Sequence, residues 1–151
     1  MHFFVRFALI SIVVFLVGIF GIAIWLDPYN EDGTARIEGT HTQMGLEPCT
    51  FKVTTGKVVN GGLPCPSCGM TTSFALLMEG DLVNSCRANF VGTMLALVSL
   101  AYIPWAIYSA HRGRPFGIKS MELTFCRLLV GFVVLMMLRW VIVLVYRMNY
   151  S

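Results

Sequence analysis

Residues 7–26 read FALISIVVFLVGIFGIAIWL, an uncharged run in which Ser11 is the single polar side chain. Twenty helical residues at about 1.5 Å each extend about 30 Å, which is the thickness of a bilayer's hydrocarbon core. Two further apolar runs cover 90–108 and 128–146, and the second of these contains Arg139. Because backbone amides in lipid need internal partners, we predict that all three runs are transmembrane helices.

The composition supports a membrane protein and excludes several soluble classes. Of the 151 residues, 56% are hydrophobic and 13% are charged, about half the charged share of a soluble domain. A domain of this size cannot bury so many apolar side chains in one core. The net charge of +3 comes from dispersed basic residues, so no nucleic-acid partner is expected. We predict one all-α membrane domain, residues 1–151, whose partner is the lipid bilayer.

The distribution of basic residues predicts the orientation. Arg112, Arg114 and Lys119 lie around the connector between the second and third runs, which places that connector in the cytoplasm. The N-terminus is then also cytoplasmic, and residues 27–89 form an extracytoplasmic segment. The first run exceeds the apolar length of a secretory signal peptide, so we expect a retained anchor.

Two local structures are predicted in the outer segment. Residues 50–59 contain the apolar side chains Phe51, Val53, Val58 and Val59 on either side of Thr54-Thr55-Gly56-Lys57. This pattern is typical of a short hairpin with Gly56 in its turn. After the cysteine-containing loop, Phe74, Leu77 and Met78 recur at helical spacing. We therefore expect a short amphipathic helix over 70–79 at the outer membrane surface, with this stripe packed against the bundle.

The end of this short helix carries its own signals. Gly80 follows it directly, where a glycine is suited to the left-handed C-terminal cap. Asp81 comes next and is expected to cap the N-terminus of a second helix, which begins near Leu82 and continues into the second span.

Four of the five cysteines fall in the predicted outer segment: Cys49, Cys65, Cys68 and Cys86. An even number of cysteines in an oxidising compartment indicates two disulfides that staple the segment. Cys126 lies near the cytoplasmic end of the third run and is expected to be a reduced, inert thiol.

The Cys65-Pro66-Ser67-Cys68 motif leaves two alternatives to a structural staple. In redox proteins, the first cysteine of such a pair at a helix N-terminus acts as the nucleophile and the second resolves the mixed disulfide. The same spacing also allows both sulfurs to bind zinc, with Cys49 and Cys86 completing the ligand set. His41 is expected to be a solvated loop residue rather than a ligand.

Several strings in the chain resemble the domain-of-unknown-function family 2752, a group of small bacterial multi-span membrane proteins. They are Cys49, Thr55-Gly56, Cys65-Pro66-x-Cys68-Gly69-x-Thr71, Leu76-Leu77-x-x-Gly80-Asp81 and Arg87-x-Asn89. The resemblance implies a bacterial cytoplasmic membrane location and structural roles for Gly69, Thr71, Gly80, Asp81 and Asn89. It implies no activity.

The chain departs from that family pattern at two positions. Thr72 stands where such proteins usually carry arginine, which removes a cation beside the cysteines. Phe90 stands where many carry proline, which implies a lost helix break and an earlier start of the second span.

Arg139 is costly inside a membrane, at about 2.5–3.5 kcal/mol on insertion scales. It lies in the outer half of the third run, on the side of Glu79 and Asp81. We expect it either to extend to the outer headgroups or to pair with one of these carboxylates and so dock the outer helix.

The sequence contains no triad, phosphate-binding loop or metalloprotease motif. We therefore expect a non-enzymatic accessory or scaffold protein of the membrane, with a membrane protein as its possible partner and with cysteines that staple the outer loop. The alternatives are a thiol-disulfide exchanger that uses Cys65 and Cys68, and a zinc-binding membrane protein that uses Cys49, Cys65, Cys68 and Cys86.

Overall fold

The computed structural model describes residues 3–56, 62–112 and 121–150. These residues are helical apart from loops and one isolated bridge between Tyr29 and Ala35, which confirms the predicted all-α class. The elements are α1 (Phe3–Trp25), the 3₁₀ helix η1 (Thr40–Met44), α2 (Thr50–Thr55), α3 (Met70–Met78), α4 (Leu82–Arg112) and α5 (Met121–Tyr150).

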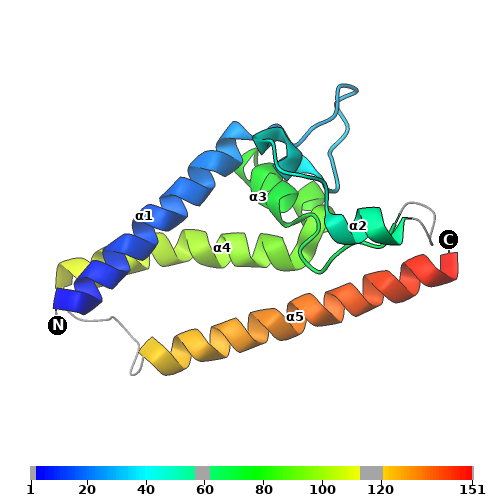
Figure 1. Ribbon diagram of the computed structural model, residues 1–151. Helices are drawn as coiled ribbons and strands as arrows, with labels where there is room; N and C mark the ends of the chain where they lie inside the picture. Colours follow the sequence, from blue (N-terminus) through cyan, green and yellow to red (C-terminus); the bar gives the residue numbers. More distant parts are fainter. Residues whose placement is uncertain (1–2, 57–61, 113–120, 151) are drawn as a thin grey trace.

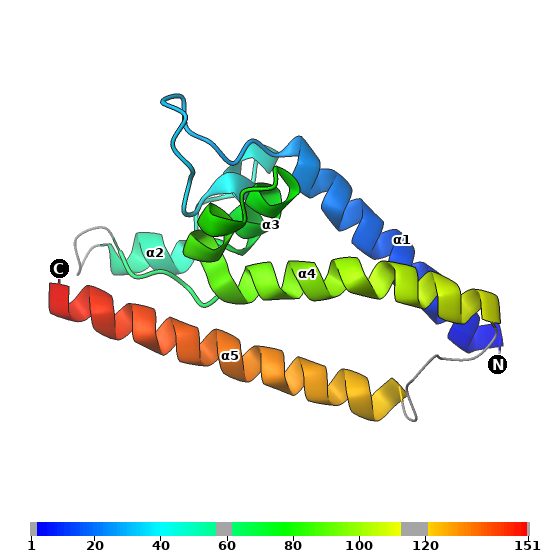
Figure 2. The same cartoon turned by 180° about the vertical axis from the view of Figure 1, so that it is seen from behind.

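The two long helices α1 and α4 meet at one end of the molecule, where the N-terminus lies, and diverge toward the other (Figure 1). The short helix α3 fills the wide end between them. Helix α5 runs along the opposite side of α4 and ends close to α2, as the reverse view also shows (Figure 2). The start of α1 and the end of α4 therefore lie at one end, and the cysteine-containing loops lie at the other.

Three helices are long and apolar enough to cross a membrane: Phe4–Trp25, Leu82–Arg112 and Leu123–Asn149. The second and third contain the predicted runs 90–108 and 128–146, and the first covers the predicted run 7–26 except for Leu26. The most apolar stretch of α5 has no buried residue, so the protein itself shields almost none of this helix. Its apolar side chains require a lipid environment.

The narrow end is closed by small side chains and one arginine. Leu9 of α1 packs on Ala106 and Ala110 of α4, where alanine allows the two helices to approach closely. Arg6 donates a hydrogen bond from Nε to the carbonyl of Ala110 at 3.1 Å. This bond satisfies a carbonyl in the last turn of α4, where a cation also interacts favourably with the helix dipole.

The predicted junction between α3 and α4 is confirmed. Gly80 has φ 82, and the amides of Gly80 and Asp81 donate to the carbonyls of Leu77 and Leu76 at 3.1 and 2.9 Å. The carboxylate of Asp81 then accepts a bond from the amide of Asn84 at 3.1 Å, which caps α4. Local hydrogen bonds at Gly80 and Asp81 thus end α3 and begin α4.

The face of α3 that is buried differs from the predicted stripe. Phe74, Leu77 and Met78 are only partly buried, although Phe74 stacks on Phe20 of α1 with 5.7 Å between ring centroids. The fully buried positions are instead Thr72, Ser73, Ala75 and Leu76, of which all but Leu76 are small or polar. Small side chains are favoured on this face of α3 because α4 packs closely against it. A Cβ on Gly92 of α4 would stand 2.4 Å from the Ser73 hydroxyl oxygen.

The predicted hairpin over Thr50–Val59 is wrong where the structure describes it, because Thr50–Thr55 forms α2. The amides of Val53 and Gly56 donate to carbonyls four residues earlier, and the Thr55 hydroxyl bonds back to the Phe51 carbonyl at 2.7 Å. Gly56 has φ −62, which is helical rather than a hairpin turn. The helix is favoured because it turns Phe51 toward Trp140 of α5, with ring centroids 6.1 Å apart. Residues 57–61 lie outside the described chain.

Helix α4 is interrupted at Asn89, whose backbone has φ −158 and ψ 98. The expectation that the absence of proline at position 90 removes the helix break is therefore wrong. The side chain of Asn89 stabilises the break without a proline, since its Oδ1 accepts a bond from the amide of Gly92 at 3.0 Å. Asn89 thus acts as an N-terminal cap for the membrane-spanning part of α4.

Candidate functional site

The Cys65–Cys68 motif forms a tight turn that leads directly into α3. The amide of Cys68 donates to the carbonyl of Cys65 at 3.1 Å, and the amide of Met70 donates to that of Ser67 at 3.0 Å. This turn points both thiols the same way and leaves their Sγ atoms 3.1 Å apart. The amide of Cys65 also donates to the Cys68 sulfur at 3.2 Å.

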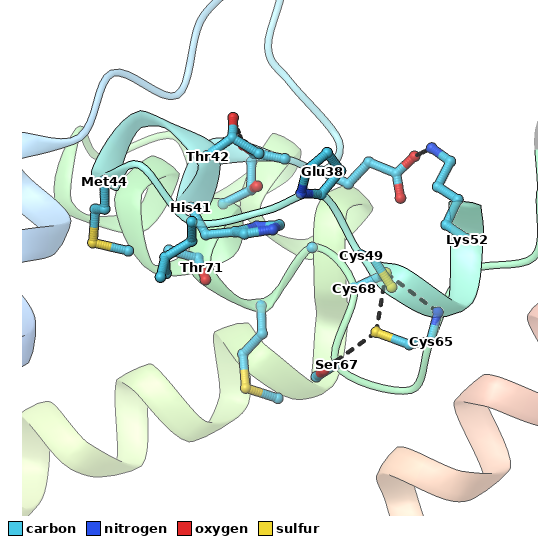
Figure 3. Close-up of a pocket in the computed structure, with 16 residues that line it drawn as sticks. Glu38, His41, Thr42, Met44, Cys49, Lys52, Cys65, Ser67, Cys68 and Thr71 are labelled. Atoms are coloured by element: carbon cyan, nitrogen blue, oxygen red, sulfur yellow. Dashed lines mark hydrogen bonds and ion pairs between the residues drawn. The ribbon is translucent and has the colours of Figure 1, made fainter. Parts of the chain in front are cut away.

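A third thiol joins this pair from a different part of the chain. Cys49 stands at the N-terminus of α2, and the sulfurs of Cys49, Cys65 and Cys68 all lie within 4.8 Å of one another. Figure 3 shows the three side chains converging from two loops. We call these three residues the thiol cluster.

The other cysteines lie apart from the thiol cluster. Cys86 was predicted to complete a zinc site, but it is on the first turns of α4 and is not among the ligands that the cluster brings together. Cys126 is exposed on α5. All five thiols are free, so the predicted disulfide staples are absent from the structure.

Gly69 fixes the distance between the thiol cluster and α4. It has φ 80, and a Cβ at this position would stand 2.6 Å from the carbonyl oxygen of Ala88 and 2.8 Å from that of Ile37. Only glycine tolerates both the backbone conformation and this close approach. The fully buried side chain of Asn89 completes the joint by donating from Nδ2 to the carbonyl of Cys68 at 3.1 Å.

Helix α5 contacts the same region through two neighbouring polar residues. Arg139 donates from Nη2 to the carbonyl of Ala88 at 2.9 Å, and Trp140 donates from Nε1 to the carbonyl of Pro64 at 2.8 Å. The break at Asn89 explains the first bond, because it ends the initial segment of α4 and leaves nearby carbonyls without helical partners. Arg139 also lies within electrostatic range of Cys65 and Cys68.

The predicted ion pair of Arg139 with Asp81 or Glu79 is therefore not what holds α5. Asp81 is engaged elsewhere, by the Tyr29 hydroxyl at 3.4 Å and the Asn84 side-chain amide at 2.6 Å. The arginine does dock α5 onto the outer segment, which was one of the two expected alternatives, but it uses a backbone carbonyl rather than a carboxylate.

Thr72, which replaces the arginine expected from the family pattern, is 1% exposed. Its hydroxyl oxygen accepts a 2.7 Å bond from the Thr40 hydroxyl, which ties η1 to α3. This site has no space for a guanidinium. The cation near the thiols is supplied instead by Arg139, from a helix distant in sequence.

The environment separates the acidities of Cys65 and Cys68. Burial raises the pKa of Cys65, but hydrogen bonds from Ser67, Cys68 and Cys49 outweigh it and leave the pKa below its ordinary value. The Ser67 hydroxyl is 3.3 Å from the Cys65 sulfur. Burial, reinforced by the hydrogen bond to Cys65, raises the pKa of Cys68 far above its ordinary value. Cys65 is thus the more readily ionised thiol, and Cys68 holds its proton.

A cavity of about 480 Å³ opens beside the thiol cluster. The three cysteines line one side of it, and Met44 and Thr71 lie on the opposite side (Figure 3). Glu38 and Lys52 form an ion pair at its margin. His41 also lines the cavity but does not belong to the close group of sulfur ligands, so the expectation that it is no ligand stays a prediction.

Two residues of this site were not identified from the sequence. Ser67 lies inside the motif and could have been noticed as a hydroxyl next to a thiol. Trp140 reads as an ordinary interfacial aromatic, and nothing in its local sequence indicates that it binds a loop 76 residues away.

The fold and the site together define a chain with three helices able to cross a membrane and a cluster of three thiols at one end. Residues 59–103 match the family described as Protein of unknown function (DUF2752), which confirms the predicted resemblance over the motif loop, α3 and most of α4. No curated protein and no solved structure matches the chain.

Proposed function

We propose that the protein is a membrane-embedded thiol-disulfide exchanger. The observation that carries this proposal is the 3.1 Å separation of the Cys65 and Cys68 sulfurs beside an open cavity. A scaffold role with two cysteine staples requires all four outer cysteines to pair, and Cys86 lies outside the thiol cluster. The redox alternative instead needs two adjacent thiols of unequal acidity, and these are present.

The exchange proceeds in two displacements. The Cys65 thiolate attacks one sulfur of a substrate disulfide, the substrate S–S bond breaks, and the leaving thiolate takes up a proton. The Cys68 thiol then loses its proton and attacks the Cys65 sulfur, which forms the Cys65–Cys68 disulfide and releases the second substrate thiol. The substrate gains two electrons and the protein pair loses two; the reverse sequence oxidises a substrate dithiol.

The surrounding residues support these two roles. Ser67 places a hydroxyl 3.3 Å from the attacking sulfur, where it stabilises the thiolate by hydrogen bonding. Arg139 adds a positive charge within range of both sulfurs. Cys68 needs no early ionisation, because it acts only after the mixed disulfide has formed.

The proposed function includes the side of the membrane on which the thiol cluster lies. The basic residues near the spans favour a cytoplasmic N-terminus in a bacterial cytoplasmic membrane, which puts the thiol cluster on the extracytoplasmic side. Disulfide-bearing proteins are found there. The partner that we propose is therefore a secreted or membrane protein with an accessible disulfide or dithiol.

A second candidate function rests on the third thiol. Three sulfurs within 4.8 Å of one another suit a zinc ion, which binds thiolates at about 2.3 Å. Cys49, Cys65 and Cys68 would be its ligands, and the adjoining cavity would leave the fourth position to water or substrate. Cys86 has no part in this arrangement.

Trapping of the mixed disulfide tests the exchange function. In Cys68→Ser protein, Cys65 should form a stable adduct with glutathione disulfide, whereas Cys65→Ser protein should form none at this site. Cys86→Ser is the matched control, because it removes a thiol outside the cluster and should leave exchange unchanged. If wild-type protein retains one zinc per chain and its thiols react only after chelation, the zinc function replaces the exchange function.

A further inference from the structure

A second cavity, of about 470 Å³, lies between α1, α3 and α4. Its volume falls in the range of about 300–1,000 Å³ that accommodates small ligands. Its lining is apolar apart from the two hydroxyl residues Thr71 and Ser99. Phe15 and Ile22 of the candidate span Phe4–Trp25 line it and are 68% and 48% exposed, so the cavity is accessible from the hydrocarbon region.

This apolar cavity adjoins the cavity of the thiol cluster. Both cavities are lined by Met44, Met70 and Thr71. Met44 and Thr71 lie across the thiol cavity from the cysteines (Figure 3). Methionine side chains are flexible and unbranched, so two of the three shared residues can adjust to a ligand. A molecule with an apolar tail and a flat polar head can therefore occupy the apolar cavity and extend toward the thiols.

The two hydroxyl groups in the apolar cavity are available to a ligand. Neither Thr71 nor Ser99 has a side-chain hydrogen bond within residues 3–56, 62–112 and 121–150, although both line the space. The neighbouring Thr72 and Ser73 hydroxyls, in contrast, are both bonded within the protein. Hydroxyl donors in an apolar pocket are suited to carbonyl oxygens of a ligand.

We propose that the apolar cavity binds a lipid-soluble quinone that oxidises the Cys65–Cys68 pair; this inference rests on the proposed exchange function. The quinone ring would pass between Met44, Met70 and Thr71 into the cavity of the thiol cluster, and the isoprenoid tail would stay among the side chains of α1. Both S–H bonds break and one S–S bond forms. The two electrons pass to the ring, and the two protons are taken up by its oxygens to give the hydroquinone.

The proposal is tested with reduced, full-length protein in detergent and decylubiquinone as the probe. Wild-type protein should convert one quinone to hydroquinone for each Cys65–Cys68 disulfide formed. Leu95→Trp places a large ring in the apolar cavity and should slow this reaction about tenfold or more. Val98→Trp is the matched control, because Val98 is on the same helix, 49% exposed and outside the cavity lining, and it should react at the wild-type rate.

Ser99→Ala keeps the fold and removes one hydroxyl, so it should weaken quinone binding even if Leu95→Trp fails to fold. Exchange with glutathione disulfide serves as the second readout and should be unaffected in all three variants. Intact exchange without quinone reduction overturns the quinone inference alone, and so does an equal quinone rate in Leu95→Trp and Val98→Trp. Loss of both reactions in wild-type protein overturns the exchange function and the inference together.

Discussion

The side chain of Asn89 connects the thiol motif to the membrane span, because it donates to the carbonyl of Cys68 at 3.1 Å while its oxygen accepts the amide of Gly92 at 3.0 Å. One fully buried amide thus ends the motif loop and begins the span. Asn89 therefore links the backbone of Cys68 directly to the start of the membrane-spanning part of α4.

Replacement of Asn89 by alanine should both destabilise the protein and release the loop. The lost cap costs about 1 kcal/mol, and the partly buried Cys68 carbonyl left without its partner costs a further ~1 kcal/mol. Thermal unfolding in detergent measures the first effect and alkylation of Cys68 the second. Asn84→Ala, at a partly buried position on the same helix, should leave Cys68 alkylation unchanged; equal effects of both variants would contradict this role.

Gly69→Ala and Gly80→Ala separate two reasons why a position requires glycine: a positive φ and the close approach of another backbone segment. Both have positive φ, 80 and 82, so each variant has a backbone penalty of about 1–2 kcal/mol. A Cβ on Gly80 meets nothing within 4 Å, whereas one on Gly69 meets two backbone carbonyls within 2.8 Å. Gly69→Ala should therefore cost about 1–3 kcal/mol more. Denaturant titrations that give equal losses would show that close approach at Gly69 is unimportant.

Ser67→Ala should make Cys65 a weaker nucleophile at neutral pH. In the wild type, burial raises the pKa of Cys65 but the hydrogen bonds led by Ser67 lower it below its ordinary value. Loss of the hydroxyl moves the pKa upward, so the thiolate fraction at neutral pH falls. The pH profile of iodoacetamide labelling should shift to higher pH, and the rate at neutral pH should fall severalfold. Ser67→Thr retains a hydroxyl and should keep the wild-type profile.

Arg139 has two separable effects. Arg139→Leu removes both the donor to Ala88 and the positive charge, and the lost hydrogen bond from a charged group costs about 1.5–3 kcal/mol. Arg139→Gln retains a donor but no charge, so it should recover stability. In both variants the pKa of Cys65 should lie above its value in the wild type. Unfolding curves and labelling profiles measure the two effects. Arg127→Leu, at an exposed position on the same helix, should change neither.

The parts of the fold that sequence predicts are those determined over a few residues. The three spans follow from long apolar runs, and the joint at Gly80 and Asp81 follows from their cap preferences. The hairpin prediction failed at Thr50–Thr55, because contact with Trp140 decides the conformation there and β-propensity is weak against such packing. The break at Asn89 was also missed, since it depends on a hydrogen bond to Cys68, 21 residues away.

The part of the candidate site that the sequence predicts is again the part formed by residues close together in the chain. Cys65 and Cys68 are neighbours in sequence, so their pairing follows from the motif. Cys49 and Cys86 were equivalent in sequence, and only the tertiary fold brings the first of them to the pair. The partner of Arg139 was misassigned because formal charge suggested a carboxylate, whereas the break in α4 exposes a carbonyl.

Helix α5 makes its hydrogen bonds to the outer segment through that segment's backbone, beside the ring contact of Trp140 with Phe51. Both of its polar anchors end on main-chain oxygens, those of Ala88 and Pro64, so substitutions at these two positions can leave the attachment intact. By contrast, a chemical event that moves the motif backbone, such as closure of a bond between Cys65 and Cys68, displaces an anchor point directly. A change of redox state at the thiols would thereby act on α5 through the contact of Trp140 with the Pro64 carbonyl.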